Sequence, residues 1–402
     1  TKDLSWAEDL ALQETELGVY SVEGRGSFLS FTDGETLSVV KNTLQSFALH
    51  ASTNYGPFLT RWGVRLSCFG EFDYSVNEGL DFSVSSARAF YDYLKETYGT
   101  WQKISEVTLL PVSSRSDLEA LPLSEVVEAC PGDWRRFRQE TVLDLVDFVS
   151  GIFRSADPNV PILFSLGTYG NGMNAAYSAV LYLCSAVDTR DVDIIGLSLC
   201  DGADGNMMLS LLSSLTSKEI SVEVDGAWAL EEGRDVSFQV ALCGKYGVFG
   251  LSTANFTLEQ LETHKETLSG YAEGFTLDET MGDADPSKVI LILSNGLGEQ
   301  TPPRSYDAVY GEAWQSLSEK GTRRVRFVTE AQIAAGESLE GVTQVFVGNL
   351  SGCVKVSYEF ARGFLASSAV FYNGNLSFLR LDGSSFDSEI STALTNRCIG
   401  EE

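Results

Sequence analysis

The sequence lacks a long apolar run. A helix that spans a membrane needs about 20 consecutive apolar residues, and nothing close to that length occurs in the 402 residues. The opening residues, TKDLSWAEDL, also lack the basic and apolar regions of a secretory signal. We therefore expect neither a membrane span nor an uncleaved signal peptide.

Positive charge is scarce as well. Lys and Arg number 28 against 56 Asp and Glu, which gives a net charge of −28. A nucleic acid would meet long-range repulsion instead of releasing counterions, so we expect no nucleic-acid partner. Such acidity suits neutral ligands such as sugars, and it slightly favours a secreted or cell-surface setting over the cytoplasm.

Motifs for metals, nucleotides and catalytic triads are missing. The seven cysteines occur without CxxC or His-linked spacing, so no metal site is predicted. Neither GxGxxG nor GxxxxGKS/T follows an apolar run, so no nucleotide cofactor is expected. The two histidines, His50 and His264, have no Ser or Cys nucleophile motif nearby, which disfavours a triad. Cys243 and several other cysteines lie in apolar segments, as is typical of buried free thiols.

The clearest positive signal is the stretch from 133 to 170. Val142, Leu145, Val149 and Ile152 recur at three- and four-residue spacing and predict one apolar helix face. A DPNVP break ends this helix. The short apolar run PILFSLG follows, as expected for a strand of a parallel sheet that is buried on both faces. The stretch therefore indicates one helix-strand step of an α/β fold.

Repeated apolar strands extend this pattern along the chain. They are predicted at 64–70, 161–167, 192–200, 219–226 and 246–252, with room for helices between them. Such alternation leaves a doubly wound sheet or a closed (β/α)8 barrel, and the missing phosphate loops favour the barrel. We expect a TIM-type barrel domain over residues 1–275.

The barrel is short at its start. Three βα units of roughly 30 residues each would have to precede residue 64, and that part of the chain fits one strand at most. We expect the first strands to come from elsewhere, including another chain. After an acidic linker, strands at 288–295, 324–329, 343–349 and 369–375 alternate with helical stretches, which predicts a smaller three-layer α/β domain over 286–402.

Several ordered segments resemble the glycoside hydrolase family 42 β-galactosidases. NYGPFLTRWGVRLSCFGEFDY is similar to the approach to that family's acid/base strand, and ARAFYDYLKETYGTWQKISE to the helix that follows it. SVEVDGAW falls where the nucleophile strand should be, and the region from 288 is similar to an amidotransferase-like trimerisation domain. The resemblance covers nearly the whole chain. It implies a carbohydrate ligand, a homo-oligomer and two catalytic carboxylates.

Two glutamates compete for the role of acid/base. The family places Asn before this residue, which favours Glu78 because it follows Asn77. Glu71 instead ends an apolar strand, and its spacing to the next helix suits the family better, so we favour Glu71. Gly70 stands where the family has Asn, which normally donates to the sugar 2-hydroxyl.

The predicted nucleophile is Glu223, with Asp225 as the alternative, because both lie on the same side of the strand EISVEVDG. Trp228 resembles the family's aromatic platform for sugars, although a core tryptophan is an equally ordinary interpretation. Asp201 follows another strand and is a further candidate for the mouth of the barrel.

The sequence thus predicts a retaining glycoside hydrolase acting on β-galactosides or related glycans by double displacement. The alternative is a catalytically inactive relative that serves as a structural, assembly or carbohydrate-binding component. Gly70, the absence of Trp from the last barrel strand and the missing first strands motivate this alternative.

Overall fold

The computed structural model describes most of the chain in two compact units. One unit comprises Thr1–Trp62 with Tyr74–Pro161, and the other comprises Gly63–Asp73 with Ile162–Glu402. The described residues are 10–15, 17–19, 21–22, 26–27, 29–65, 81–169, 191–199, 202–225, 236, 240, 243–244, 246, 248–254, 256–272, 287–293, 310–311, 313–314, 317, 325–348, 352–372 and 376–399.

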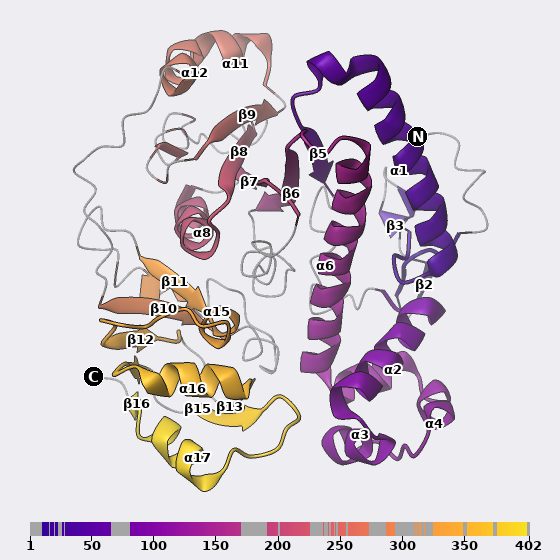
Figure 1. Ribbon diagram of the computed structural model, residues 1–402, viewed down its shortest axis with the longest axis vertical. Coiled ribbons are helices and arrows are strands. Elements are labelled where there is room, and N and C mark those ends of the chain that lie inside the picture. The colour runs from indigo at the N-terminus through magenta and orange to yellow at the C-terminus, as the bar shows by residue number, and fades with distance from the viewer. Residues whose placement is uncertain are drawn as a thin grey trace. The chain divides into compact units, whose positions relative to one another are not determined.

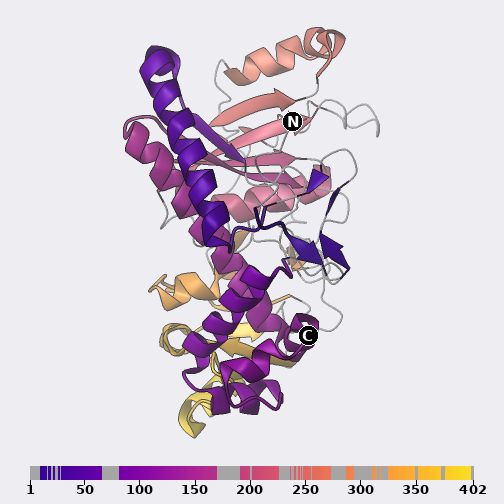
Figure 2. The ribbon, with the colours of Figure 1, turned by 90° about the vertical axis from the view of Figure 1, so that its right-hand side faces the viewer.

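The first unit is mainly helical (Figure 1). Its helices are α1 (Gly34–Tyr55), η2 (Gly56–Phe58), α2 (Val84–Tyr98), α3 (Trp101–Thr108), α4 (Arg115–Glu119), α5 (Leu123–Ala129) and α6 (Pro131–Ala156). Four two-residue strands, β1 (Glu14–Thr15), β2 (Gly18–Val19), β3 (Ser21–Val22) and β4 (Gly26–Ser27), form two antiparallel pairs. The two long helices, α1 and α6, lie side by side (Figures 1 and 2).

Side-chain caps set the helix boundaries. Asp33 accepts from the Thr36 amide at the start of α1, and Ser83 accepts from the Ser86 amide at the start of α2. Gly99 ends α2 with a φ of 73°, a conformation in which a side chain would be strained, and Thr100 then caps α3. The segment ARAFYDYLKETYGTWQKISE, expected to be helical, is thus helical and is divided at Gly99 into α2 and α3.

An aromatic core holds α2 against α6. Phe90 meets Trp134 edge to face with ring centroids 4.9 Å apart, and it lies 5.4 Å from the ring of Phe137. The three side chains belong to one buried cluster. Aromatic pairs in such geometries add to the stabilisation that comes from burying their area. The predicted apolar face of α6 is confirmed, since Leu145 and Ile152 are also buried.

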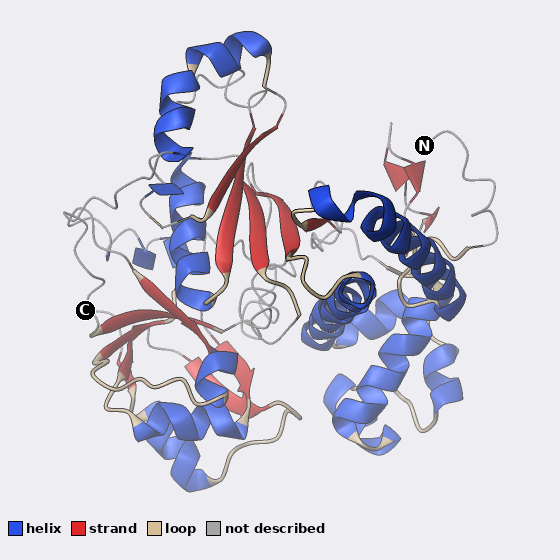
Figure 3. Ribbon diagram, turned by 45° about the horizontal axis from the view of Figure 1, so that its top comes forward, coloured by secondary structure: helices blue, strands red, loops and turns tan. Residues whose placement is uncertain are grey.

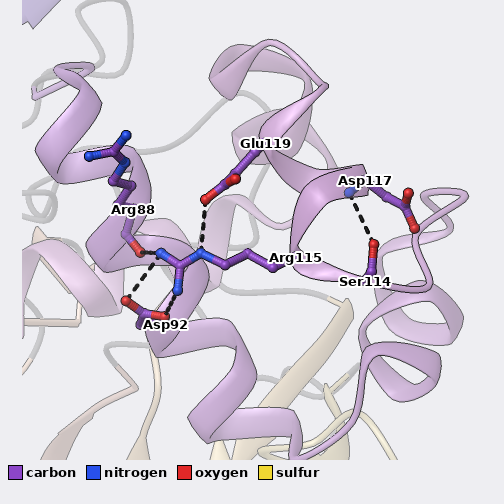
Figure 4. A network of polar contacts seen from close by, with 6 residues as sticks. All are labelled: Arg88, Asp92, Ser114, Arg115, Asp117 and Glu119. Atoms are coloured by element: carbon purple, nitrogen blue, oxygen red, sulfur yellow. Dashed lines mark hydrogen bonds and ion pairs between the residues drawn. The ribbon is translucent and has the colours of Figure 1, made fainter.

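A surface network connects α4 with α2 (Figure 4). The guanidinium of Arg115 donates to both carboxylate oxygens of Asp92 and to the backbone oxygen of Arg88. It also donates to Glu119 at 2.8 Å, and the carboxylates of Glu119 and Asp92 raise the pKa of Arg115. Exposed ion pairs contribute at most about 1 kcal/mol each, so the network orients α4 more than it stabilises the unit.

The second unit contains a five-stranded sheet with the order β5-β6-β7-β8-β9 (Figure 3). Its strands are β5 (Trp62–Arg65), β6 (Ile162–Tyr169), β7 (Ile194–Leu199), β8 (Glu219–Asp225) and β9 (Gly250–Ala254), and α8 (Gly202–Leu215) connects β7 to β8. The pairs β6/β7, β7/β8 and β8/β9 are all parallel. Strands that neighbour each other in sequence also neighbour in space, as in a barrel.

The predicted strands are confirmed with one shift. The run at 246–252 was expected to be a strand, yet β9 begins only at Gly250. Tyr246 and Val248 are buried before the strand starts, and the Val248 amide donates to the Cys243 oxygen. Apolar residues in a buried connection produce the same sequence signal as a strand. The part of the first predicted strand beyond Arg65 lies outside the described residues.

A second parallel sheet has the order β11-β10-β12-β14-β16. Its strands are β10 (Lys288–Ile292), β11 (Arg326–Thr329), β12 (Gln344–Phe346), β14 (Val370–Tyr372) and β16 (Cys398–Ile399); β13 (Gly352–Val356) and β15 (Leu376–Arg380) form a separate parallel pair. Two helices, α11 (Leu258–Thr263) and α12 (Lys265–Ala272), follow β9 in the chain. Three more, α15 (Glu330–Ala334), α16 (Tyr358–Ala366) and α17 (Ser388–Thr395), lie among the strands of the second sheet in the sequence. The four strands predicted for this region are confirmed, whereas β13, β15 and β16 were not predicted.

Hydrogen bonds connect helix α8 with the region of β11 and α15 within the second unit. The hydroxyl of Ser210 on α8 donates to the Val325 oxygen, just before β11, at 3.0 Å, and the side-chain amide of Gln332 on α15 donates to the Leu215 oxygen at 3.5 Å. The division of the chain into 1–275 and 286–402 remains a prediction, and most of the predicted acidic linker lies outside the described residues. Among the described helices, none is long and apolar enough to cross a membrane.

Candidate active site

Glu223 lies near the carboxyl end of β8. Val222 and Val224 on either side of it are buried, whereas Glu223 is half-buried and shares the opposite face of the strand with Ser221. In parallel α/β folds the carboxyl ends of the strands are where sites form. The predicted nucleophile therefore occupies a position from which a carboxylate can act on a ligand.

Small residues flank Glu223 on the neighbouring strands. Ser198 of β7 and Ser252 of β9 are its partners in register. The Ser252 hydroxyl donates to the Val222 oxygen at 3.5 Å. No bulky residue stands beside Glu223 in this row of the sheet.

The next row towards the amino ends of the strands is also built from small residues. Ser165, Gly196, Ser221 and Gly250 are in register across β6 to β9. A Cβ at Gly196 would lie 3.0 Å from Cδ2 of Leu163 and 3.2 Å from the Ser165 Cα. A Cβ at Gly250 would lie 3.2 Å from the Ser221 hydroxyl. A side chain at Gly196 would therefore require Leu163 or Ser165 of the neighbouring strand to shift by a few tenths of an ångström.

The other predicted site residues are not brought together by the described structure. Glu71, Glu78, Asp201 and Trp228 lie outside the described residues. Asp225 ends β8 in register with Ala254, and nothing is described of its side chain. The meeting of two carboxylates across the sheet therefore remains a prediction.

A buried carboxylate that sequence reasoning missed lies directly after the segment that contains Glu71 and Glu78. Asp81 accepts from the Ser30 hydroxyl at 2.5 Å and from the backbone amides of Glu14 and Ser83 at 3.0 and 2.9 Å. Ser85 extends the cluster, since its hydroxyl lies 3.1 Å from that of Ser83. The sequence run DFSVSS indicates this cluster. In it an acidic residue comes just before serines, and the serines have the spacing of a helix N-cap.

The Asp81 cluster fixes a local crossing of three chain segments. Its hydrogen bonds connect the strand that contains Glu14, the approach to α1 and the start of α2. These bonds give the buried carboxylate of Asp81 its hydrogen-bond partners. Within the described residues, no group of three or more His, Cys, Asp or Glu side chains is arranged to hold a metal ion.

The arrangement of elements is that of a TIM-type α/β fold, a curled parallel half barrel followed by a smaller α/β domain. No protein-family model matches the sequence, and no curated protein matches it either. Solved structures do match, and they show that the chain has a fold remotely similar to that of family 42 glycoside hydrolases.

Three β-galactosidases illustrate the likeness. The protein from the Antarctic haloarchaeon Halorubrum lacusprofundi has a TM-score of 0.69 at 13% identity, with 98% of this chain and 64% of that chain covered. The protein from Bacillus circulans sp. alkalophilus has a TM-score of 0.68 at 14% identity, covering 98% and 62%. A catalytic mutant of the GH42 enzyme Gan42B from G. stearothermophilus has a TM-score of 0.63 at 12% identity, covering 96% and 62%.

The likeness confirms the predicted fold over nearly the whole chain. The chain nevertheless spans under two thirds of the length of these solved relatives. At this identity the comparison shows a glycoside hydrolase fold, and it does not extend to catalysis, mechanism or substrate.

Proposed function

We propose that the protein is a retaining glycoside hydrolase acting on β-galactosides or related glycans. The observation that carries this proposal is the position of Glu223, a half-buried carboxylate near the end of a parallel strand, in a fold shared with β-galactosidases. The small residues in register with it, Ser198 and Ser252, support the proposal, because they place no bulky residue directly beside Glu223 on the neighbouring strands.

In this mechanism Glu223 attacks the anomeric carbon while Glu71 protonates the leaving oxygen, which gives a glycosyl ester and releases the aglycone alcohol. Glu71 then removes a proton from water, and the water oxygen replaces the ester at the anomeric carbon. The step requires carboxyl groups about 5 to 5.5 Å apart. Glu78 and Asp225 are the alternatives for the two roles, and Trp228 and Asp201 are proposed to contact the sugar.

The decisive test is turnover of an aryl β-galactoside. We expect Glu223→Gln to lower kcat/KM by at least about a thousandfold, and Glu71→Gln by about a hundredfold to ten-thousandfold. Glu219→Gln is the matched control, because Glu219 lies on the same strand at its exposed amino end. Unchanged turnover in Glu223→Gln removes this residue from the mechanism and transfers the role to Asp225.

A small external nucleophile separates lost chemistry from lost structure. Azide is expected to restore turnover in Glu223→Gly and to give a glycosyl azide, because it takes the place of the missing carboxylate at the anomeric carbon. A variant that is inactive because it is misfolded gains nothing from azide. The identity of the product therefore reports on the role of Glu223 itself.

The second candidate is a protein that binds carbohydrate or assembles with other chains without catalysis. The specific observation in its favour is that the barrel sheet has five described strands where a closed barrel has eight. A homo-oligomer, or another chain that supplies the remaining strands, would then complete the ring. Binding of galactose by calorimetry without turnover of any aryl glycoside would support this candidate over the enzyme.

A further inference from the structure

Arg380, the last residue of β15, is held by two aromatic rings. Its guanidinium carbon lies 5.9 Å from the ring centre of Tyr358 and 5.6 Å from that of Phe386. Tyr358 is the first residue of α16, and Phe386 lies just before α17, so three neighbouring elements meet at this side chain (Figure 1). Contacts between a cation and aromatic faces fix the orientation of the guanidinium plane.

No carboxylate pairs with this arginine. Within the described part of the chain, the guanidinium of Arg380 makes neither an ion pair nor a hydrogen bond. Arg115 and Arg326 are also partly exposed, and both donate to carboxylates. Acidic residues outnumber basic ones by 56 to 28, so potential partners are plentiful. The cation of Arg380 is therefore available to an acceptor from outside the chain.

The turn after β15 fixes the backbone of Arg380. Its amide donates to the Ser384 oxygen at 2.8 Å, and its oxygen accepts from the Gly383 amide at 2.9 Å. The carboxylate of Asp382, an acid close in sequence, accepts from the Ser384 amide at 2.9 Å and is thereby engaged in the turn itself. An arginine whose backbone and guanidinium are both held loses little conformational freedom when it binds a ligand.

The guanidinium has one edge for a ligand. Among its three nitrogens only Nε is both buried and without an acceptor, so the terminal pair, Nη1 and Nη2, is accessible. Two adjacent N–H groups match two oxygens of a carboxylate or of a sulfate ester, which bind side by side. Tyr358 next to it is 42% exposed, whereas Phe386 is buried. An exposed aromatic ring offers an apolar surface to the C–H face of a sugar.

We propose that Arg380 and Tyr358 form a binding site for an acidic glycan, a sugar chain that carries a carboxylate or a sulfate ester. Nη1 and Nη2 of Arg380 bind the oxyanion, and the Tyr358 ring contacts the sugar that carries it. The oxyanion follows from the cation that lacks an acid partner, and the sugar rests on the proposed function. A net charge of −28 repels acidic ligands from most of the surface, so this cation would select where they bind.

Calorimetry with four small probes tests the chemistry of the ligand. The acidic probes are digalacturonate and galactose 6-sulfate, the neutral probe is galactobiose, and acetate is an anion without a sugar. We expect one or both acidic sugars to bind at least about tenfold more tightly than galactobiose and acetate. Their affinity should fall when NaCl rises from about 0.01 M to about 0.1 M, since the screening length shortens from about 30 Å to about 10 Å. Whichever acidic sugar binds identifies the oxyanion.

Variants locate the site. Arg380→Gln should raise the Kd for the acidic sugar by at least about tenfold, because two hydrogen bonds to a charged group are lost. Arg115→Gln is the matched control, since Arg115 is a partly exposed arginine that already pairs with Asp92. Arg380→Lys should also weaken binding, because an ammonium cannot form two parallel hydrogen bonds. It keeps the charge and most of the stem between the rings, so it carries the test if Arg380→Gln does not fold. Tyr358→Ala should raise the Kd by about threefold to tenfold.

Three results would overturn the proposal. The first is that neither acidic sugar binds at low salt. The second is equal binding of the acidic sugars to the parent protein, Arg380→Gln and Arg380→Lys, which would place them elsewhere. The third is equal affinity for acetate and the acidic sugars, which would leave the sugar without a role. The proposed hydrolase activity fails or stands separately, because binding is measured without turnover and Glu223→Gln should bind the acidic sugar as the parent protein does.

Discussion

The two five-stranded sheets of the second unit are equal in strand number and differ in composition. Every residue of β10 from Val289 to Ile292 is buried and apolar. In β8, buried Ile220, Val222 and Val224 alternate with Ser221 and Glu223. A parallel sheet covered on both faces has continuous apolar strands. The C-terminal sheet is built as core on both faces, whereas the barrel sheet keeps one face polar.

The carboxyl ends of the strands in the two sheets show the same contrast between a packed and a polar environment. The order of the C-terminal sheet has a switch point between β10 and β12, where doubly wound sheets bind ligands. Tyr310 is fully buried there, and its hydroxyl accepts from the Leu293 amide at 3.0 Å, directly after β10. The end of β8 instead presents Glu223. The comparison indicates a structural role for Tyr310 at the end of the C-terminal sheet, whereas the proposed chemistry belongs to the barrel sheet.

Truncation of consecutive strand residues tests this difference most strongly. Ile290→Ala and Leu291→Ala should each lower the free energy of unfolding by about 2 to 5 kcal/mol, because both faces of β10 are packed. In β8, Ile220→Ala should cost a similar amount, whereas Glu223→Gln should change stability by less than about 0.5 kcal/mol. Urea unfolding measures all four. A large loss in Glu223→Gln would show that this carboxylate has a structural role.

The next largest effect on stability is expected from removal of the buried hydroxyl of Tyr310 at the switch point. Tyr310→Phe leaves the Leu293 amide without its acceptor and should cost about 1 to 3 kcal/mol. Tyr358→Phe is the control, because Tyr358 is partly exposed on α16 and its loss should fall within about 0.5 kcal/mol. Equal thermal shifts in the two variants would mean that the hydroxyl of Tyr310 does not hold this strand end.

The sequence predicted the sheets far better than the site. Apolar runs such as 288–295 and 219–226 mark strands because burial requires them, and periodicity is local information. The two-residue strand β16 has too few residues for a pattern and was missed, and β13 and β15 were missed as well. The pairing of Glu223 with Ser198 and Ser252 depends on register between distant segments, which no local pattern contains. The Asp81 cluster depends on three such segments meeting.

Glycine substitutions sharpen the contrast between close-packed strands and open helix surface. Gly196→Ala should destabilise the barrel sheet by about 1 to 3 kcal/mol, since its Cβ would contact Leu163 and Ser165. Gly151→Ala in α6 meets open space and should stabilise the protein by about 0.5 to 1 kcal/mol. Thermal unfolding of both variants decides the matter, and a neutral Gly196→Ala would indicate that β6 and β7 separate easily.

The smallest effect concerns two thiols, Cys243 before β9 and Cys353 on β13. Burial raises the pKa of Cys243 from 9.0 to about 12, whereas Cys353 is exposed. A folded-state pKa above the unfolded value favours folding below about pH 9, and this contribution is lost as pH rises towards about 12. The stability difference between the parent protein and Cys243→Ala should therefore shrink over that range of pH. Peptide mapping after thiol labelling should find Cys353 modified in the native protein and Cys243 only after unfolding. Labelling of Cys243 at the native rate of Cys353 would show that the segment before β9 opens readily, and the barrel sheet would then be less firmly packed at this edge than its buried residues indicate.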